Sequence, residues 1–171
     1  GAFYKGKVVV VIGGGDSAME EATFLTKFAS KVTLINRTEN FRASKFMLAK
    51  ARANPKIEII TSAVVEEVLG VENKKVSGVK LKNVKTGDFF EVACSGFFVA
   101  IGHKPNISLF KGQIDVDKNN YIITKPKSTA TNVEGVFACG DVQDSIYRQA
   151  ITAAGTGCMS AIEAERYLAH K

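Results

Sequence analysis

The residues best suited to chemistry in this chain lie directly after an apolar run near the N-terminus. The stretch Lys7 to Ala22, KVVVVIGGGDSAMEEA, changes within a few residues from a strand-like run to a helical pattern. Gly13, Gly15 and Ala18 satisfy the spacing G-x-G-x-x-G/A, in which the first glycine permits a tight turn and the second lets a pyrophosphate approach the backbone. Ala18 is small enough for the helix to pack closely on its strand. The pattern predicts a dinucleotide site.

The helix after this turn is expected to begin near Asp16 and Ser17. Its first backbone N–H groups lack intrahelical partners, and the positive end of its dipole would point at the bound phosphates. Glycines also mark ordinary turns, so a glycine-rich turn in some other α/β domain is the alternative. The strand on one side and the amphipathic helix on the other favour the nucleotide site.

A second polar set decides which nucleotide fits. After a predicted strand at Lys31 to Ile35, an acid about twenty residues beyond the glycines would bond a ribose 2′-hydroxyl and indicate NAD. This chain has Asn36 there, followed by Arg37 and Arg42. Guanidinium groups match phosphate oxygens, so the sequence favours NADPH over NADH. The alternative is a solvated loop in which Glu39 pairs with an arginine.

A third set lies near the C-terminus, where the apolar run FACGDV ends in Gly140 and Asp141. An Asp just beyond a strand can accept hydrogen bonds from ribityl or ribose hydroxyls. A helix is predicted from about Tyr147 to Leu168, and its N-terminus can stabilise negative charge. The alternative is a core strand followed by a turn. The helix N-terminus would comprise Arg148, Gln149 and Ala150.

The cysteines and histidines indicate no metal site. Cys94, Cys139 and Cys158 are separated by 45 and 19 residues, which is neither a C-x-x-C pair nor a zinc spacing. Reduced thiols and a cytoplasmic location are therefore expected. His103 has no Cys, Ser or acid nearby in the sequence, which favours a structural loop residue over a catalytic base.

Composition is that of an ordinary globular protein: 171 residues, 46% hydrophobic and 23% charged. The apolar run Val8 to Ile12 is too short to cross a bilayer, and no signal peptide is recognised, so no membrane partner is expected. The net charge of +6 is scattered, and no aromatic interleaving or helix-turn-helix pattern accompanies it, so no nucleic-acid partner is expected. The densest lysine group falls on alternating segments typical of a solvated sheet face: Lys74, Lys75, Lys80, Lys82 and Lys85.

The remaining elements are predicted from periodicity and turn signals. A short helix over Ser44 to Ala53, capped by Ser44, precedes a third strand, and an antiparallel meander of three strands comes next. Gly96 to Ile101 is continuously apolar, as expected of a strand buried on both faces, and a domain boundary is predicted after it. Beyond it, two short strands and one long helix are too little for a full core. The other predicted strands are Lys56–Ile60, Val64–Leu69, Lys75–Val84, Asp88–Ala93, Tyr121–Thr124 and Val136–Ala138.

Taken together and in order, GGGDSAMEEA, NRTENFRAS, AIGHKPN, FACGDV and RQAITAAGTGC closely resemble the low-molecular-weight, bacterial and plant type of thioredoxin reductase. The resemblance covers essentially the whole chain, and the flavoprotein component of alkyl hydroperoxide reductase is a close relative. It implies an α/β fold: a Rossmann-like three-layer NADPH-binding domain with an antiparallel β-meander at residues 1–102, and the C-terminal portion of a split FAD-binding domain at residues 103–171.

The same resemblance implies a homodimeric flavoprotein in which electrons pass from NADPH through FAD and a dithiol to thioredoxin or a related disulfide protein. Pyrophosphate would be held by the glycine turn, 2′-phosphate by the arginines, and flavin by the C-terminal set. The cofactor-binding residues it implies are Gly13, Gly15, Asp16, Ser17, Ala18, Asn36, Arg37, Arg42, Ile101, Gly102, Gly140, Asp141, Arg148, Gln149 and Ala150.

Two features depart from the family pattern. Asn36-Arg37-Thr38 stands where the family usually has His-Arg-Arg, which removes one arginine and one imidazole. The redox C-x-x-C and the flavin glycine fingerprint are absent, and the opening Gly-Ala-Phe-Tyr resembles the segment directly after that C-x-x-C in the family. The catalytic disulfide is therefore expected upstream of Gly1. A ferredoxin or flavodoxin reductase without the cysteine pair, and a non-catalytic NADPH-binding module, are the alternatives.

Overall fold

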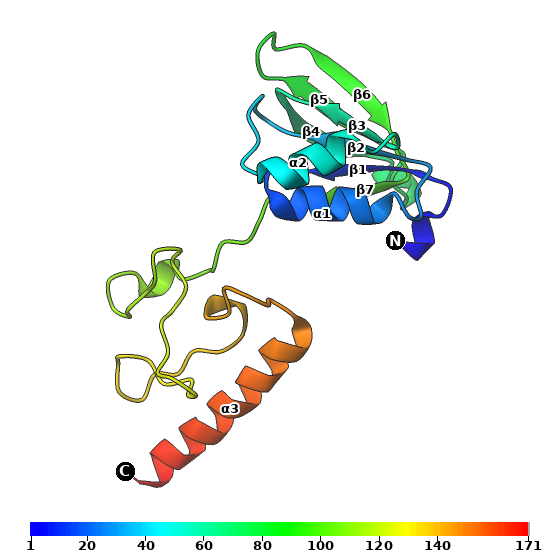
Figure 1. The fold of residues 1–171 in the computed structure, drawn as a ribbon. Helices are drawn as coiled ribbons and strands as arrows, with labels where there is room; N and C mark the ends of the chain where they lie inside the picture. The colour runs from blue at the N-terminus through cyan, green and yellow to red at the C-terminus, as the bar shows by residue number, and fades with distance from the viewer. Residues whose placement is uncertain (171) are drawn as a thin grey trace. The chain divides into compact units, whose positions relative to one another are not determined.

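The computed structural model describes residues 1–170, which form two compact units divided between Gly102 and His103. The first unit runs from blue to green in Figure 1, and the second runs on to red. No helix in the described part of the chain is long and apolar enough to cross a bilayer.

The first unit is built on a parallel sheet with the strand order β3-β2-β1-β7. Helix α1 connects β1 to β2, and α2 connects β2 to β3, as the predicted βαβ pattern requires. Ser44 caps α2 by accepting a hydrogen bond from the Met47 N–H, as predicted. The elements are β1 (Val8–Ile12), α1 (Asp16–Leu25), β2 (Lys31–Ile35), α2 (Lys45–Arg52), β3 (Ile57–Ile60) and β7 (Gly96–Val99).

A three-stranded antiparallel meander, in the order β4-β5-β6, forms the third layer and confirms the prediction. Side chains on β1 alternate between the two sides of the sheet: Val9 and Val11 pack in the cluster that contains the helices, and Val10 packs in the cluster that contains the meander. Figure 1 shows α1 and α2 together on one side of the parallel sheet. The meander strands are β4 (Ala63–Leu69), β5 (Gly78–Asn83) and β6 (Phe89–Ala93).

Strand β7 agrees only in part with its prediction. It pairs with β1 alone and is therefore an edge strand. Both of its faces are covered, since Phe98 packs against the cluster that contains the helices and Phe97 against the cluster that contains the meander, but these two side chains are only partly buried. It ends at Val99, which is 59% exposed, and Ile101 beyond it is 60% exposed. The apolar run therefore combines a half-buried strand with an exposed apolar turn, which composition alone cannot separate from a buried strand.

The second unit has one long helix, α3 (Ala150–Ala169), and little sheet. The strands predicted at Tyr121–Thr124 and Val136–Ala138 are wrong: in the described residues these segments form only isolated bridges, Val116 with Ile122 and Ala130 with Phe137. A small cluster of Ile107, Ile122 and Ala138 is buried, but α3 has no buried residue. Single turns of 3-10 helix lie at Ala2–Tyr4, Val71–Asn73, Ser108–Phe110 and Gly140–Val142.

Candidate functional site

The glycine turn after β1 contains two glycines with different physical roles. Gly13 has φ +153°, and a Cβ there would lie 2.2 Å from the Ala100 carbonyl oxygen and 2.9 Å from the Ala18 Cβ. Gly15 is the N-cap of α1 with φ −102°, an ordinary value, and a Cβ there would meet nothing within 4 Å. Gly13 is therefore needed by the fold, whereas Gly15 leaves open space beside the helix N-terminus.

The loop of residues 37–43, here called the arginine loop, is hydrogen-bonded directly to that turn. The backbone N–H groups of Arg42 and Ala43 donate to the Gly14 carbonyl at 2.7 and 3.0 Å. Beyond the loop, the Ser44 N–H donates to Asp16 Oδ1 at 2.8 Å. Asp16 thus joins the start of α1 to the start of α2, so its carboxylate has a structural partner within the protein.

A hollow of about 370 Å³ opens where the turn, the arginine loop and the end of β7 meet. It brings together residues far apart in sequence that separate motifs had indicated. Ile101 forms an apolar part of its wall, whereas Gly102 is not among the lining residues and Ala18 is buried beneath the turn. The lining residues that matter here are Gly13, Gly14, Asn36, Arg37, Arg42 and Ile101.

The charges around the hollow favour an anion. Arg37 is exposed, Arg42 lies in the same exposed loop, and neither forms an ion pair within residues 1–170. Glu39 instead pairs with Lys85 Nζ at 2.5 Å, in the turn between β5 and β6. The alternative in which Glu39 neutralises an arginine is therefore not what the structure has, and both guanidinium groups remain available to a phosphate.

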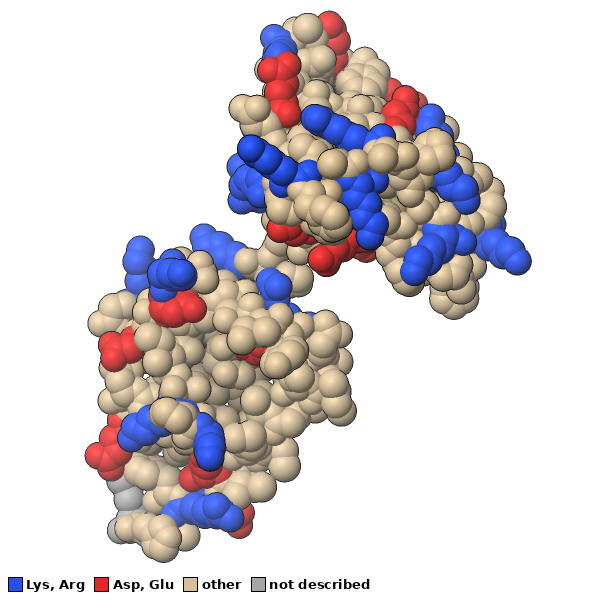
Figure 2. Space-filling model, viewed as in Figure 1, with Lys and Arg blue, Asp and Glu red and all other residues tan. Residues whose placement is uncertain are grey.

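On the face shown in Figure 2, Lys and Arg side chains are dispersed among acidic and neutral ones and form no single block. Two of the clustered lysines, Lys80 and Lys82 on β5, hold their ammonium groups 5.2 and 5.6 Å from the centre of the Phe89 ring. Their charge is thus directed at an aromatic neighbour on β6.

In the second unit, the predicted flavin-side residues surround the start of α3. Gly140 has φ +71°, and its N–H donates to Thr156 Oγ1 at 2.9 Å, which ties the turn to the helix. Asp141 is exposed in the same turn. Helix α3 begins at Ala150 with Gln149 as N-cap, later than the predicted Tyr147. His103 is exposed, and its Nδ1 lies 3.5 Å from an Arg148 guanidinium nitrogen.

Asp144 explains the late start of α3, and no sequence motif indicated it. Its carboxylate accepts hydrogen bonds from the N–H groups of Tyr147 (2.8 Å), Arg148 (2.9 Å) and Ile146 (3.0 Å), and from the Thr152 hydroxyl (3.0 Å). These bonds, led by that from Tyr147, lower the pKa of Asp144. They also hold Arg148 at φ +51°, outside the helix. An Asp shortly before a helix start is the local signal that could have indicated this role.

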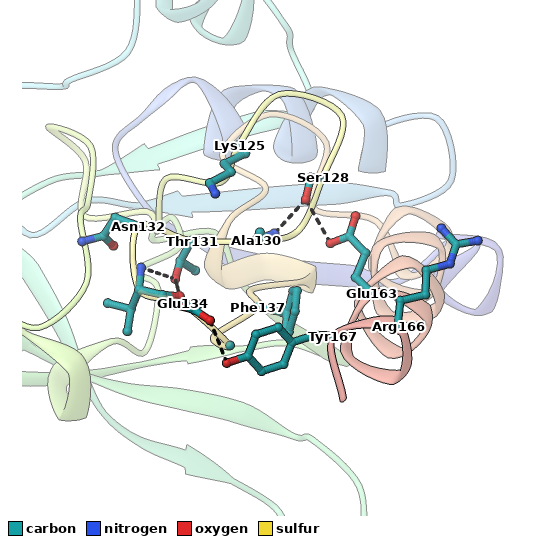
Figure 3. Close-up of a pocket in the computed structure, with 12 residues that line it drawn as sticks. Lys125, Ser128, Ala130, Thr131, Asn132, Glu134, Phe137, Glu163, Arg166 and Tyr167 are labelled. Carbon is teal, nitrogen blue, oxygen red and sulfur yellow. Dashed lines mark hydrogen bonds between the residues drawn. The ribbon is translucent and has the colours of Figure 1, made fainter. Parts of the chain in front are cut away.

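A second hollow, of about 570 Å³, lies between α3 and the loop at residues 125–135 (Figure 3). Its most prominent acid, Glu163, accepts hydrogen bonds from the Thr129 hydroxyl (2.6 Å), the Thr129 N–H (2.9 Å) and the Ser128 hydroxyl (3.0 Å). These bonds, with Thr129 contributing most, lower the Glu163 pKa. Although this hollow is the larger, its carboxylate is occupied in fastening a loop to α3, so it is structural.

No group of three metal-ligating side chains occurs within the part of the chain that the structure describes. The three cysteines are free, and burial raises the pKa of the Cys94 thiol. The chemistry available is therefore that of the glycine turn with its arginine loop, and of the polar residues at the start of α3.

This arrangement of glycine turn, parallel sheet and meander defines a class. Residues 3–157 match the family described as pyridine nucleotide-disulphide oxidoreductase, and the chain belongs to that family. Its fold is the mixed α/β type of the solved relatives.

Individual relatives are more specific. The chain is 60% identical over 169 residues to a thioredoxin reductase of Rickettsia bellii, covering 98% of this chain and 54% of that protein. It is 57% identical to thioredoxin reductase 2 of Arabidopsis thaliana, covering 96% of this chain and 43% of that protein. A solved thioredoxin reductase from Streptococcus pyogenes matches with TM-score 0.83 and 39% identity, covering 99% of this chain and 55% of that one. The chain thus spans about half the length of these relatives.

Proposed function

We propose that residues 1–102 are the NADPH-binding domain, and residues from 103 onward the C-terminal portion of the FAD-binding domain, of an NADPH-dependent flavoprotein that reduces thioredoxin or a related disulfide protein. One observation carries the proposal: the glycine turn that leaves open space at Gly15 is hydrogen-bonded to a loop with two arginines that form no ion pair in residues 1–170. Together they offer separate sites for a pyrophosphate and for a second phosphate.

In this proposal the residues around the glycine turn and the arginine loop each bind a different part of NADPH. The N–H groups at the start of α1 and the open face of Gly15 receive the pyrophosphate. Arg37 and Arg42 bind the 2′-phosphate, and Ile101 packs against an apolar part of the dinucleotide. When bound, NADPH supplies a hydride to the flavin.

The second unit supplies the flavin side. The exposed Asp141 carboxylate accepts hydrogen bonds from flavin hydroxyls, and Gly140 allows close backbone approach. The N-terminus of α3, at Arg148, Gln149 and Ala150, favours the negative charge of a reduced flavin. The α3 start is suited to this because Asp144 fixes its geometry through four hydrogen bonds.

The resemblance extends the proposal to a cytoplasmic homodimer. The free thiols of Cys94, Cys139 and Cys158 are consistent with a reducing compartment. Reduction of the protein substrate is proposed for the complete reductase, since the relatives are about twice as long as this chain.

The proposal is tested by calorimetric titration of the chain with NADPH and with NADH. We expect NADPH to bind at least about tenfold more tightly, because only NADPH presents a phosphate to the arginines. Gly15→Ala is expected to weaken both nucleotides at least about tenfold without lowering the thermal midpoint, since its Cβ fills ligand space rather than protein space. Gly155→Ala, another glycine with open surroundings, is the matched control. Equal affinity for the two nucleotides would contradict the arginine assignment.

A further inference from the structure

We propose that Asn36 is a positioning residue for nucleotide selection: its side-chain amide fixes the arginine loop against the glycine turn and so sets Arg37 and Arg42 for the 2′-phosphate. The proposal rests on the NADPH site argued above. It gives Asn36 a role other than direct contact with the ribose, in place of the cofactor contact that the sequence predicts.

The donor groups of Asn36 are fully used within the protein. The residue is 6% exposed, and its Nδ2 donates to the carbonyl oxygens of Thr38 at 2.8 Å and Asn40 at 3.1 Å. A side-chain amide carries two N–H donors, so neither is left for a ribose hydroxyl. The Thr38 hydroxyl also donates to the Asn40 carbonyl at 2.8 Å. The first half of the arginine loop is therefore folded around this one amide.

The acceptor side of the same amide faces the glycine turn. A Cβ at Gly14 would lie 2.4 Å from Asn36 Oδ1, so the two groups are in direct contact. Gly14 in turn accepts hydrogen bonds from Arg42 and Ala43 in the second half of the loop. The amide thus bonds the first half of the loop directly and contacts Gly14, which bonds the second half. This also explains why the middle one of the three consecutive glycines is a glycine, because a side chain at Gly14 would displace Asn36.

The backbone of Asn36 is equally fixed. Its N–H donates to the Ile60 carbonyl at 2.9 Å, and its carbonyl accepts from the Ala63 N–H at 3.3 Å. These bonds join the end of β2 to the end of β3 and the start of β4. Asn36 therefore connects the arginine loop to the sheet: its backbone is bonded to the strand ends and its side chain to the loop.

A loop that is already ordered before the nucleotide binds should bind the 2′-phosphate of NADPH more tightly. Arginine side chains on an unfixed loop would lose conformational freedom on binding, and that loss would weaken NADPH. NADH presents no 2′-phosphate to this loop, so its affinity depends less on the loop's order than that of NADPH does. A change at Asn36 is thus expected to alter the ratio of the two affinities, which a general loss of stability would not do.

The test measures dissociation constants of NADPH and NADH for the whole chain and for Asn36→Ala. We expect NADPH to weaken about tenfold and NADH to change less than about twofold. Asn40→Ala is the matched control, since Asn40 contributes its backbone carbonyl, which that substitution keeps. It should leave both constants unchanged.

Asn36→His provides a second variant, should the alanine variant fail to fold. An imidazole keeps an N–H donor, so NADPH preference is expected to lie between those of the parent chain and Asn36→Ala. An unchanged preference in the substituted chain, or equal weakening of both nucleotides, would overturn the role of Asn36. Absence of any preference in the parent chain would instead overturn the NADPH site itself, so the two failures are distinguishable.

Discussion

The two units of this chain are stabilised in different ways. In the first, Val9, Val10 and Val11 of the central strand are fully buried between a helical layer and a meander. In the second, a twenty-residue helix has no buried residue, and two carboxylates fasten it to its loops: Glu163 of the helix accepts from Thr129, and Asp144 of the preceding loop accepts from Thr152 of the helix. The first unit therefore holds its strands and helices together by packing and adds hydrogen bonds that fix the arginine loop. The second unit relies mainly on hydrogen bonds to Asp144 and Glu163.

The difference is greatest at the apolar side chains. Leu25 of α1 is 2% exposed, whereas Ile151 and Leu168 of α3 are 79% and 70% exposed. An amphipathic helix gains stability by burying one face, and α3 buries little. A recognisable turn motif in the sequence therefore does not imply a large buried core. Both units contain such a turn, but only the first unit encloses a large core.

Amide hydrogen exchange should show the largest contrast. We expect amides of β1 to exchange at least about 100-fold more slowly than those of the middle of α3, because opening β1 requires disrupting the core, whereas α3 can open locally. Exchange measured residue by residue by NMR provides the comparison. Equal protection would mean that α3 is covered in solution by a further surface.

A matched pair of leucine truncations should give the next largest difference. Leu25→Ala removes a buried side chain and is expected to destabilise the first unit by about 2–5 kcal/mol. Leu168→Ala, also in a helix, is expected to cost under about 0.5 kcal/mol. Urea unfolding, followed through NMR signals from each unit, measures both. A large cost at Leu168 would contradict its exposed position.

The two units should also differ in their stability at low pH, although by a smaller amount. The pKa values of Asp144 and Glu163 are lowered from ordinary values of 3.8 and 4.5, because hydrogen bonds stabilise their ionised forms. A carboxyl with a lowered folded pKa contributes stability above its unfolded pKa and loses that contribution as the pH falls through the folded value. We therefore expect the second unit to lose ordered NMR signals before the first as the pH falls below about 4.5.

The variant Asp144→Asn tests the cause of this acid sensitivity. It retains the shape of the side chain but has no proton to gain in this range, so part of the pH dependence should disappear. If the first unit were to unfold before the second in acid, the two carboxylates would not be the controlling groups.

Much of the first unit could be predicted from local patterns. The glycine turn, the capped α2 and the meander are confirmed because each depends on neighbours in sequence: a strand run, a Ser before a helix, turns between alternating segments. The edge position of β7 could not be predicted, since an apolar run does not say which strands lie beside it. The two strands predicted in the second unit are wrong for the same reason. Each of these segments forms a single bridge and does not pair along its length with a neighbouring strand.

Some features of the candidate site could likewise be predicted from the sequence, and others could not. Its glycines and arginines could be predicted from spacing, but their convergence with Ile101 around one hollow depends on the order of strands in the sheet. Glu163 could not be singled out, because its partners are backbone and hydroxyl groups chosen by the fold, and any Glu can accept such bonds. Asp144 has a local signal, its position shortly before a helix start, but its individual partners also depend on the fold.

The sequence by itself determined where the chain turns, which residue types stand at the turn and that arginines rather than an acid come after the second strand, because spacing and charge are local properties. Only the tertiary structure decided that Gly13 serves the fold while Gly15 leaves open space beside a helix start. It also decided that Asn36 donates to the arginine loop. The physical reason is that open space and hydrogen-bond partners depend on which distant segments lie close together, and packing sets that proximity.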